Sequence, residues 1–179
     1  MESKEDLLKW YDEEYCLKAI EQDPLNLQYV KNPTEKICLE AVKKDKLALL
    51  YVKNPTEEMY LEAIKQDGWA LRYIHNPTEK LCLIAVKQNG LALQYIHNPT
   101  KEMCLIAIRQ NGCALQFVYN QTEEMCLEAV EQDGKALQFV YNQTEEICLA
   151  ALNQNIEAIK YVNIKKFPKV YEKYLFMIK

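Results

Sequence analysis

The sequence predicts an all-α protein, an α-solenoid (superhelix) of seven two-helix repeats with capping helices at both ends. An Asn-Pro-Thr or Asn-Gln-Thr segment recurs every 22 residues. Apolar residues fall at helical spacing in two short segments of each repeat, and the second segment keeps an alanine from Ala48 to Ala158. A fixed period of this length indicates units that build a common core by packing on their neighbours. The recurring segment begins at Asn32, Asn54, Asn76, Asn98, Asn120 and Asn142.

The repeat register divides the chain into three parts within one predicted domain, residues 1–179. Residues 1–9 form an N-terminal cap, in which Ser3 caps a short helix that buries Leu7, Leu8 and Trp10. Residues 10–163 hold the seven repeats. Residues 164–179 form a C-terminal capping helix that opens at Pro168 and carries one apolar stripe. The alternative for this last segment is an amphipathic membrane anchor, helped by its lysines.

The first helix of each repeat is expected to begin at the recurring segment. In the repeat from Asn32, the asparagine is a favoured N-cap, Pro33 suits the first turn, and Glu35 can reach back to the cap. The apolar residues at 37, 38, 41 and 42 then define a buried face. In the middle repeats Asp or Asn followed by Gly ends this helix, with the glycine expected to supply a left-handed C-cap.

The second segment of each repeat is predicted to be a shorter helix. Positions 48, 49 and 52 are spaced by one and three to four residues, which fits about two helical turns. A strand of the leucine-rich-repeat type is the alternative, but the spacing of its leucines and asparagine does not fit these units. Both helices are too short to be stable alone and need their neighbours.

These residues also carry a resemblance. The run Cys-Leu-x-Ala-Val-x-x-Asn-Gly-x-Ala-Leu, together with the Asn-Pro-Thr-Glu start, resembles short helical repeats of giant amoeba viruses, with bacterial relatives, that are catalogued as a domain of unknown function. The resemblance covers nearly the whole chain and is weakest in the first repeat, where Trp10-Tyr11-Asp12 replaces Asn-Pro-Thr. It implies an α-helical array in a viral or host-interaction setting and no catalytic residue.

Several classes of function find no support in the sequence. The acidic N-terminus does not resemble a secretory signal, and no apolar run approaches the ~18 residues needed to span a bilayer. We therefore expect a cytoplasmic protein, in the host cytoplasm or the virion if viral, and no membrane partner. Six of the seven cysteines share one repeat position and are expected to be buried thiols, with Cys113 outside that position. We expect no cofactor, no metal site and no enzymatic activity, because no catalytic or metal-binding motif occurs.

Varying positions on an exposed face are the candidates for partner binding. Positions 47, 50 and 53 of the second helix define such a row, which drifts in chemistry from one repeat to the next. Tryptophan, tyrosine and arginine dominate interface hot spots. The alternative is that these side chains pack on the adjacent repeat. The predicted partner-binding residues are Trp69, Arg72, His75, Leu91, Gln94, His97, Gln116 and Tyr119.

A secondary patch is predicted on the first helix. Ile84 and Ile106 replace a glutamate in adjacent repeats, which leaves Lys87 and Arg109 without that partner. An exposed aliphatic pair beside two cations would suit an acidic ligand with an apolar face. Single exposed isoleucines are also ordinary.

The sequence therefore predicts a non-enzymatic scaffold that binds a protein partner along the exposed face of the second helices. The alternative is a structural protein that associates end to end, since residues 120–163 are acidic and the C-terminal segment is basic. Polyanion binding by the cations at 43, 65, 87 and 109 is a minor alternative, because the pI of about 5.4 argues against nucleic acid.

Overall fold

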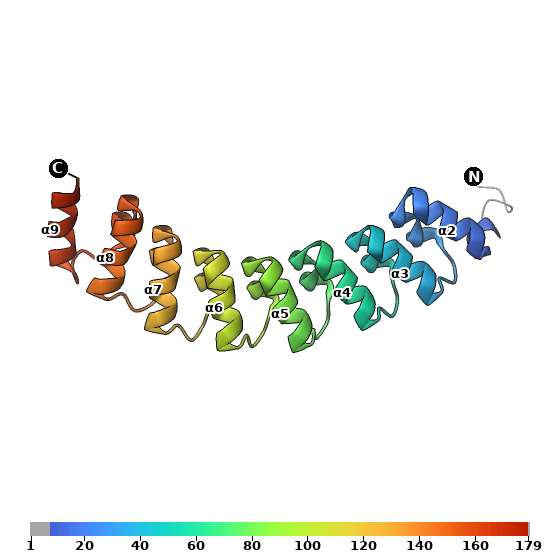
Figure 1. Cartoon of the computed structure of the whole chain (residues 1–179), viewed down its shortest axis with the longest axis horizontal. Helices are drawn as coiled ribbons and strands as arrows, with labels where there is room; N and C mark the ends of the chain where they lie inside the picture. Colours follow the sequence, from blue (N-terminus) through green and yellow to red (C-terminus); the bar gives the residue numbers. More distant parts are fainter. Residues whose placement is uncertain (1–7, 179) are drawn as a thin grey trace. The chain divides into compact units, whose positions relative to one another are not determined.

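A computed structural model describes residues 8–178, and this part of the chain is helical throughout apart from its connections (Figure 1). From α2 to η8, ten-residue α-helices alternate with six-residue 3-10 helices, so the predicted all-α repeat is confirmed. The elements are η1 Lys9–Tyr11, α2 Glu13–Gln22, η2 Pro24–Tyr29, α3 Glu35–Lys44, η3 Lys46–Tyr51, α4 Glu57–Gln66, η4 Gly68–Tyr73, α5 Glu79–Gln88, η5 Gly90–Tyr95, α6 Lys101–Gln110, η6 Gly112–Phe117, α7 Glu123–Gln132, η7 Gly134–Phe139, α8 Glu145–Gln154, η8 Ile156–Tyr161 and α9 Pro168–Met177.

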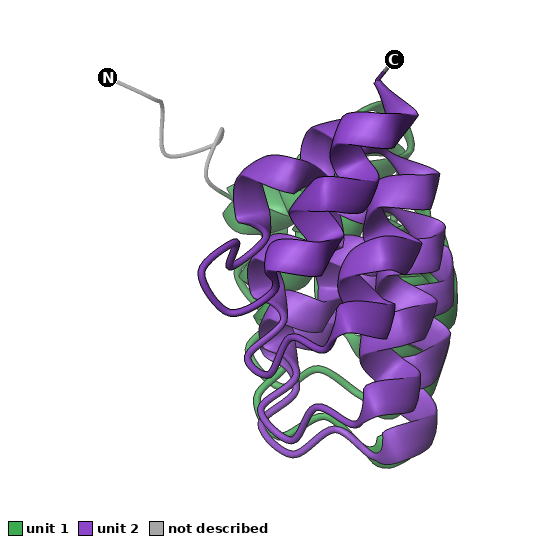
Figure 2. Ribbon diagram, turned by 90° about the vertical axis from the view of Figure 1, so that its left-hand side faces the viewer, with its two compact units in different colours: residues 1–88 green, residues 89–179 purple. Residues whose placement is uncertain are grey.

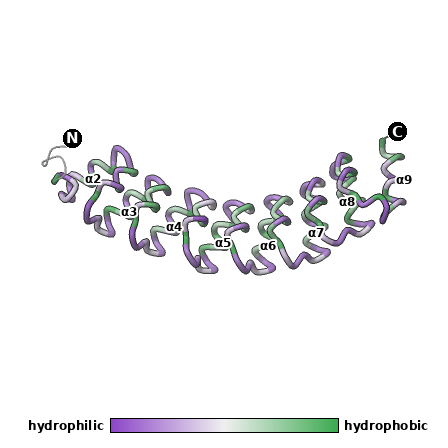
Figure 3. Tube along the Cα trace, turned by 180° about the vertical axis from the view of Figure 1, so that it is seen from behind, coloured by the Kyte–Doolittle hydropathy of each residue, from purple (hydrophilic) through white to green (hydrophobic). Residues whose placement is uncertain are grey.

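The chain forms two compact units, residues 1–88 and 89–179 (Figure 2). In the first unit α2 to α5 pack each on the next, and η2 to η4 follow the same order. In the second unit α6, α7 and α8 pack side by side, and η5 to η8 do so as well. Each unit therefore has one layer of α-helices and one of 3-10 helices. Along the trace, apolar segments of the helices alternate with polar connections (Figure 3). The prediction of one domain stays a prediction.

The second helix of each repeat is a 3-10 helix, which the spacing of its apolar residues had not distinguished from an α-helix. In η3 the hydrogen bonds run from residue i+3 to i, as from the Ala48 N–H to the Asp45 carbonyl at 3.0 Å. The Asp45 carboxylate also accepts from the Leu47 N–H at 2.8 Å and so caps the helix start. The same cap, from an aspartate or asparagine, opens each 3-10 helix from η2 to η8.

The expected asparagine N-cap of the first helix is wrong, because threonine caps it. In α3 the Thr34 hydroxyl accepts from the Ile37 N–H at 3.4 Å, and the helix begins at Glu35 rather than at Pro33. Asn32 lies in a bend and Pro33 follows it in the connection before the helix. The same threonine position caps α3 to α8, and Asp12 replaces it at α2.

The expected left-handed glycine C-cap is also wrong, because no described glycine has a positive φ. Gly90, Gly112 and Gly134 open 3-10 helices and lie against the next α-helix. A Cβ at Gly112 would stand 2.4 Å from the Ala129 carbonyl oxygen, and one at Gly90 would stand 2.5 Å from that of Ala107. The glycines are therefore needed for close packing between repeats.

The core consists of a few repeat positions that are buried in most of the described repeats, with exceptions such as Tyr15 at the position of Ile37 and Tyr60 at that of Cys38. In α3 these are Ile37, Cys38, Ala41 and Val42, and in η3 they are Ala48 and Leu49. This matches the predicted apolar face of the first helix. No side chain with a formal charge is buried among residues 8–178. Apolar packing between neighbouring helices therefore provides most of the stability.

The two predicted caps have different outcomes. The N-terminal cap lies almost wholly outside the described residues, as do Ser3 and Leu7. Leu8 is 63% exposed, not buried as expected. At the other end α9 begins at Pro168, packs against α8 and η8, and buries Val170. Within the described part of the chain, no helix has the length and apolarity to cross a membrane.

Candidate functional site

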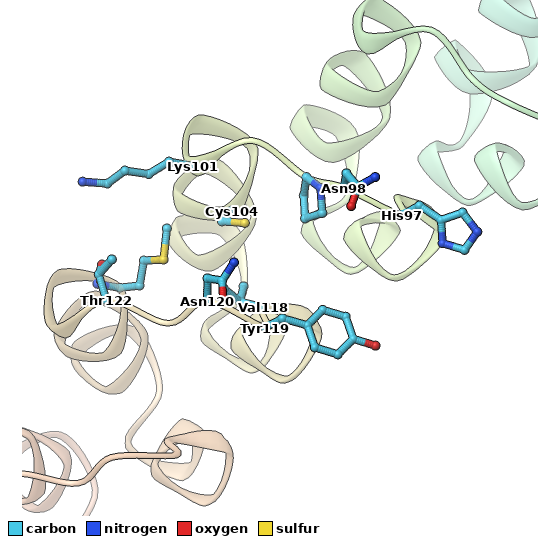
Figure 4. A pocket seen from close by; sticks show the side chains of 10 residues that line it. His97, Asn98, Lys101, Cys104, Val118, Tyr119, Asn120 and Thr122 are labelled. Carbon is cyan, nitrogen blue, oxygen red and sulfur yellow. The ribbon is translucent and has the colours of Figure 1, made fainter.

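Open pockets lie between the loops that precede successive α-helices. In the second unit, one pocket of about 320 Å³ lies between the loop before α6 and the loop before α7 (Figure 4). His97 and Asn98 line one edge, and Tyr119 and Asn120 line the other. In Figure 4 the side chains of His97 and Tyr119 extend to one side, whereas Lys101 extends to the opposite side.

The pocket recurs at other junctions of the array. The next one, of about 380 Å³, lies between the loops before α7 and α8 and shares Tyr119 and Asn120 with the first. The two pockets of the second unit are therefore continuous along the array. The first unit has an equivalent pocket of about 450 Å³ at its own junction, between Asn32 and Asn54. Volumes of this order are typical of ligand pockets.

A constant frame and one varying position make up each of these pockets. The frame contains an asparagine from each loop, a threonine N-cap and a cysteine of the shared position. The residue before each asparagine varies: it is Lys31 and Lys53 in the pocket of the first unit, and His97, Tyr119 and Tyr141 in those of the second. The exposed fractions of Tyr119 and Tyr141 are 83% and 60%. The array thus displays different chemistry at the same place in successive repeats.

The asparagines of this frame have no structural partner. Within residues 8–178, the side chains of Asn98, Asn120 and Asn142 form no hydrogen bond. The same holds for the equivalent side chains of Asn32, Asn54 and Asn76. Since threonine caps the helix, the repeated carboxamide is not explained by capping.

Glutamine replaces proline beside two of these asparagines and joins successive loops. The Gln121 carboxamide donates to the Phe139 carbonyl at 2.8 Å, and its oxygen accepts from the Tyr141 N–H at 3.0 Å. Gln143 repeats both bonds with Tyr161, at 2.8 Å, and Asn163, at 3.0 Å. We call this arrangement of Gln121 and Gln143 the glutamine clamp. The clamp was not predicted from the sequence, where its signal is the replacement of proline by glutamine at the same position of two successive repeats.

The cysteines form the inner wall of the pockets and are free thiols, as predicted. Cys38, Cys104 and Cys126 line one pocket each and are buried. Burial raises the pKa of each of these thiols above its usual value, and it raises that of Cys148 to about 11. They are therefore protonated at neutral pH and poorly suited to nucleophilic chemistry.

Cys113 stands apart from the other thiols, as predicted, but it is half-buried. Its Sγ lies 3.5 Å from the Asp133 Oδ2. Burial raises the pKa of the Cys113 thiol, and the hydrogen bond to Asp133 raises it further. Across residues 8–178, no group of three His, Cys, Asp or Glu side chains is arranged to hold a metal ion.

The predicted partner-binding row has an uneven structure in the first unit. Trp69 is half-buried, and its backbone N–H donates to the Asp67 carboxylate at 2.9 Å. Arg72 is exposed, and its guanidinium lies 4.5 Å from the centre of the Tyr73 ring. His75 is exposed at the start of the following loop. The row thus passes from a packed first position to an exposed last one.

The same gradation holds in the second unit. Leu91 is half-buried. Gln94 and Gln116 are exposed, but each donates to a carbonyl of its own 3-10 helix at 3.0 Å. Of the predicted row in this unit, His97 and Tyr119 are the residues that line a pocket. The loop end of the row is therefore the stronger candidate for contact with a partner.

The secondary patch differs from its prediction. Ile84 and Ile106 are half-buried rather than exposed. Arg109 also has a partner, because its Nε lies 3.3 Å from the Glu128 Oε2 of the next helix. Lys87 is exposed near the end of α5. The bridge to Glu128 was not predicted, because the prediction considered charge pairs within one helix and this pair joins two helices.

Comparison with known proteins identifies one family. The family profile described as "Domain of unknown function (DUF4116)" matches overlapping stretches that tile most of the chain, at residues 12–55, 34–78, 56–99, 78–122 and 122–168. Comparison with curated proteins and with solved structures gave no match. The repeats inferred from the sequence are therefore those of a recognised family.

Proposed function

The chain belongs to the DUF4116 family, and we propose that it is a non-enzymatic scaffold that binds a partner protein along the exposed face of its 3-10 helices and the adjoining loops. One observation carries the proposal: open pockets recur between successive loops, with a constant frame and a varying flanking residue. Repeat arrays commonly place variable side chains of this kind on an extended binding surface. A cytoplasmic location, in a virus or its host, belongs to the same proposal.

The chemistry of the pockets supports binding rather than catalysis. Their inner walls carry protonated thiols, and their edges carry carboxamides, hydroxyls and aromatic rings. These groups suit hydrogen bonding and stacking with a polypeptide. The cations considered for polyanion binding are partly neutralised, since Lys43 lies 3.1 Å from Glu40 and Lys65 lies 2.7 Å from Glu62.

Site-specific photo-crosslinking in cells tests the scaffold. A benzophenone amino acid replaces Tyr119 at the pocket edge or, as the control, Glu131, which is exposed near the end of α7. We expect one crosslinked protein from position 119 and none from position 131. The same products at both positions, or none at position 119, would refute binding at this face.

End-to-end assembly is the second candidate. It is favoured by exposed apolar side chains at the end of α9 and just after it, Phe176 at 77% and Ile178 at 54%. Against it, Lys173 of α9 is 3.4 Å from Glu145 of α8, so part of the basic charge is neutralised within the chain. Light scattering over a salt series tests it, because a monomer at every salt concentration rules out assembly through these charges.

A further inference from the structure

We propose that Asn98, Asn120 and Asn142 of the second unit form an asparagine ladder that binds the backbone of a proline-rich segment in the polyproline II conformation. Tyr119 and Tyr141 supply the flanking aromatic surfaces. The inference rests on the proposed scaffold function and names the class of partner for its pockets.

The asparagine ladder offers polar groups that the fold does not use. Each carboxamide has two donor hydrogens and one acceptor oxygen, and within residues 8–178 none of these side chains forms a hydrogen bond. The asparagine is kept in Asn120-Gln121 and Asn142-Gln143, so a preference for asparagine before proline does not explain it. A ligand that presents a regular series of carbonyl groups would use these donors.

The spacing of the ladder fits a particular backbone. Its asparagines precede α6, α7 and α8, which pack side by side, and packed helices are about 8–10 Å apart. A polyproline II helix has three residues per turn and rises about 9 Å per turn. Every third residue of such a segment would therefore present the same groups to successive asparagines. The shared lining of the two pockets by Tyr119 and Asn120 makes the path continuous.

The chemistry at the pocket edges favours proline. A polyproline II segment forms no internal hydrogen bonds, so its carbonyl groups are free to accept from carboxamides. Grooves lined by aromatic rings bind such segments at low entropic cost, because the conformation is already formed. Tyr119 and Tyr141 are the most exposed tyrosines of the second unit and belong to adjoining loops.

The carboxylate of Glu123 favours a basic residue in the ligand at the second pocket. Glu123 lines this pocket and is exposed, and within the described part of the chain it forms no ion pair. A lysine or arginine beside the prolines would meet this carboxylate. The pocket of the first unit has Lys31 and Lys53 in place of the tyrosines. It therefore lacks the aromatic edges and serves as an internal control.

Nuclear magnetic resonance of the full chain tests the ladder. The ¹⁵N-labelled protein is titrated with decaproline, and with a glycine-serine peptide of equal length as control. We expect decaproline, but not the glycine-serine peptide, to cause saturable shifts of the side-chain amide signals of Asn98, Asn120 and Asn142. Asn120→Ala should weaken binding about tenfold, which corresponds to one or two hydrogen bonds. Asn54→Ala, in the lysine-edged pocket, should leave the affinity unchanged.

Further variants keep the outcome decisive. Glu123→Gln should weaken binding of a decaproline that ends in lysine and leave plain decaproline unaffected. Unchanged affinity in Asn120→Ala, or equal binding of the glycine-serine peptide, would overturn the ladder. If Asn120→Ala lowers the melting temperature, Asn120→Asp takes its place, because aspartate keeps the turn preference and the acceptor oxygen but has no donor hydrogens. Decaproline binding by Asn120→Asp with the affinity of the parent chain would also overturn the ladder. If an excess of decaproline does not reduce the amount of protein crosslinked from position 119, this inference is refuted but the proposed scaffold function is not.

Discussion

Removal of the glutamine clamp gives the sharpest test of how the loops are held. Gln121→Ala deletes the bond to the Phe139 carbonyl at 2.8 Å and the bond from the Tyr141 N–H at 3.0 Å. Each hydrogen bond is worth about 1 kcal/mol net. We therefore expect the free energy of unfolding to fall by about 2 kcal/mol.

The assay combines urea denaturation with amide hydrogen exchange of the full chain. The Tyr141 amide should lose protection in Gln121→Ala, whereas the Asn163 amide, held by Gln143, should keep it. Gln138→Ala is the matched control, because within residues 8–178 the Gln138 side chain bonds to the Lys135 carbonyl of its own helix, at 3.0 Å, and to no other group. It should change stability by no more than about 0.5 kcal/mol. Equal losses in the two variants, or unchanged exchange at Tyr141, would refute the clamp.

Three further predictions concern the caps, the glycines and the separate thiol. Thr100→Ala should lower the free energy of unfolding by about 1 kcal/mol, because it removes the N-cap of α6. Asn98→Ala should change it by no more than about 0.5 kcal/mol. Melting curves in which Asn98→Ala is the more destabilising variant would show that asparagine is the cap. Gly112→Ala should cost about 1–3 kcal/mol through the clash with the Ala129 carbonyl, and a melting temperature equal to that of the parent chain would contradict the close approach. Asp133→Asn should lower the raised pKa of the Cys113 thiol toward its usual value, so thiol titration of the folded protein should show faster Cys113 modification, at lower pH, than in the parent chain. Asparagine at 133 keeps the cap of η7, as Asn111 and Asn155 do for η6 and η8, so an unchanged rate would show that Asp133 does not control this thiol.

The period of the sequence predicted the architecture because most repeat positions have the same environment in successive repeats. Ile37, Cys38, Ala41 and Val42 are all buried, as their spacing predicted. Such a pattern reports burial directly, since it repeats with the same register in successive units. The same comparison within the chain also found His97 and Tyr119, which lie at the two edges of one pocket.

The predictions of an asparagine N-cap and of a left-handed glycine are wrong because, in each case, two local interpretations fit the same residues. Asparagine and threonine are both favoured N-caps, and the proline after Asn32 suits either a first turn or an extended connection. The position of the connection depends on how the preceding 3-10 helix packs, which local propensity does not contain. Gly112 illustrates the same limit, because the residue is required by a carbonyl group seventeen positions later in the chain, at Ala129.

Proline and glutamine at one repeat position provide two ways to fix the same loop. Pro33, Pro55, Pro77 and Pro99 restrict the backbone dihedral φ and so limit the freedom of the unfolded loop. Gln121 and Gln143 lack that restriction and instead bond to the following loop. The clamp from Gln121 ends at the backbone of Tyr141, whose ring is an edge of the second pocket. Loss of the clamp should therefore weaken decaproline binding at this edge as well as stability. Binding that survives Gln121→Ala unchanged would show that the position of Tyr141 is set by other contacts.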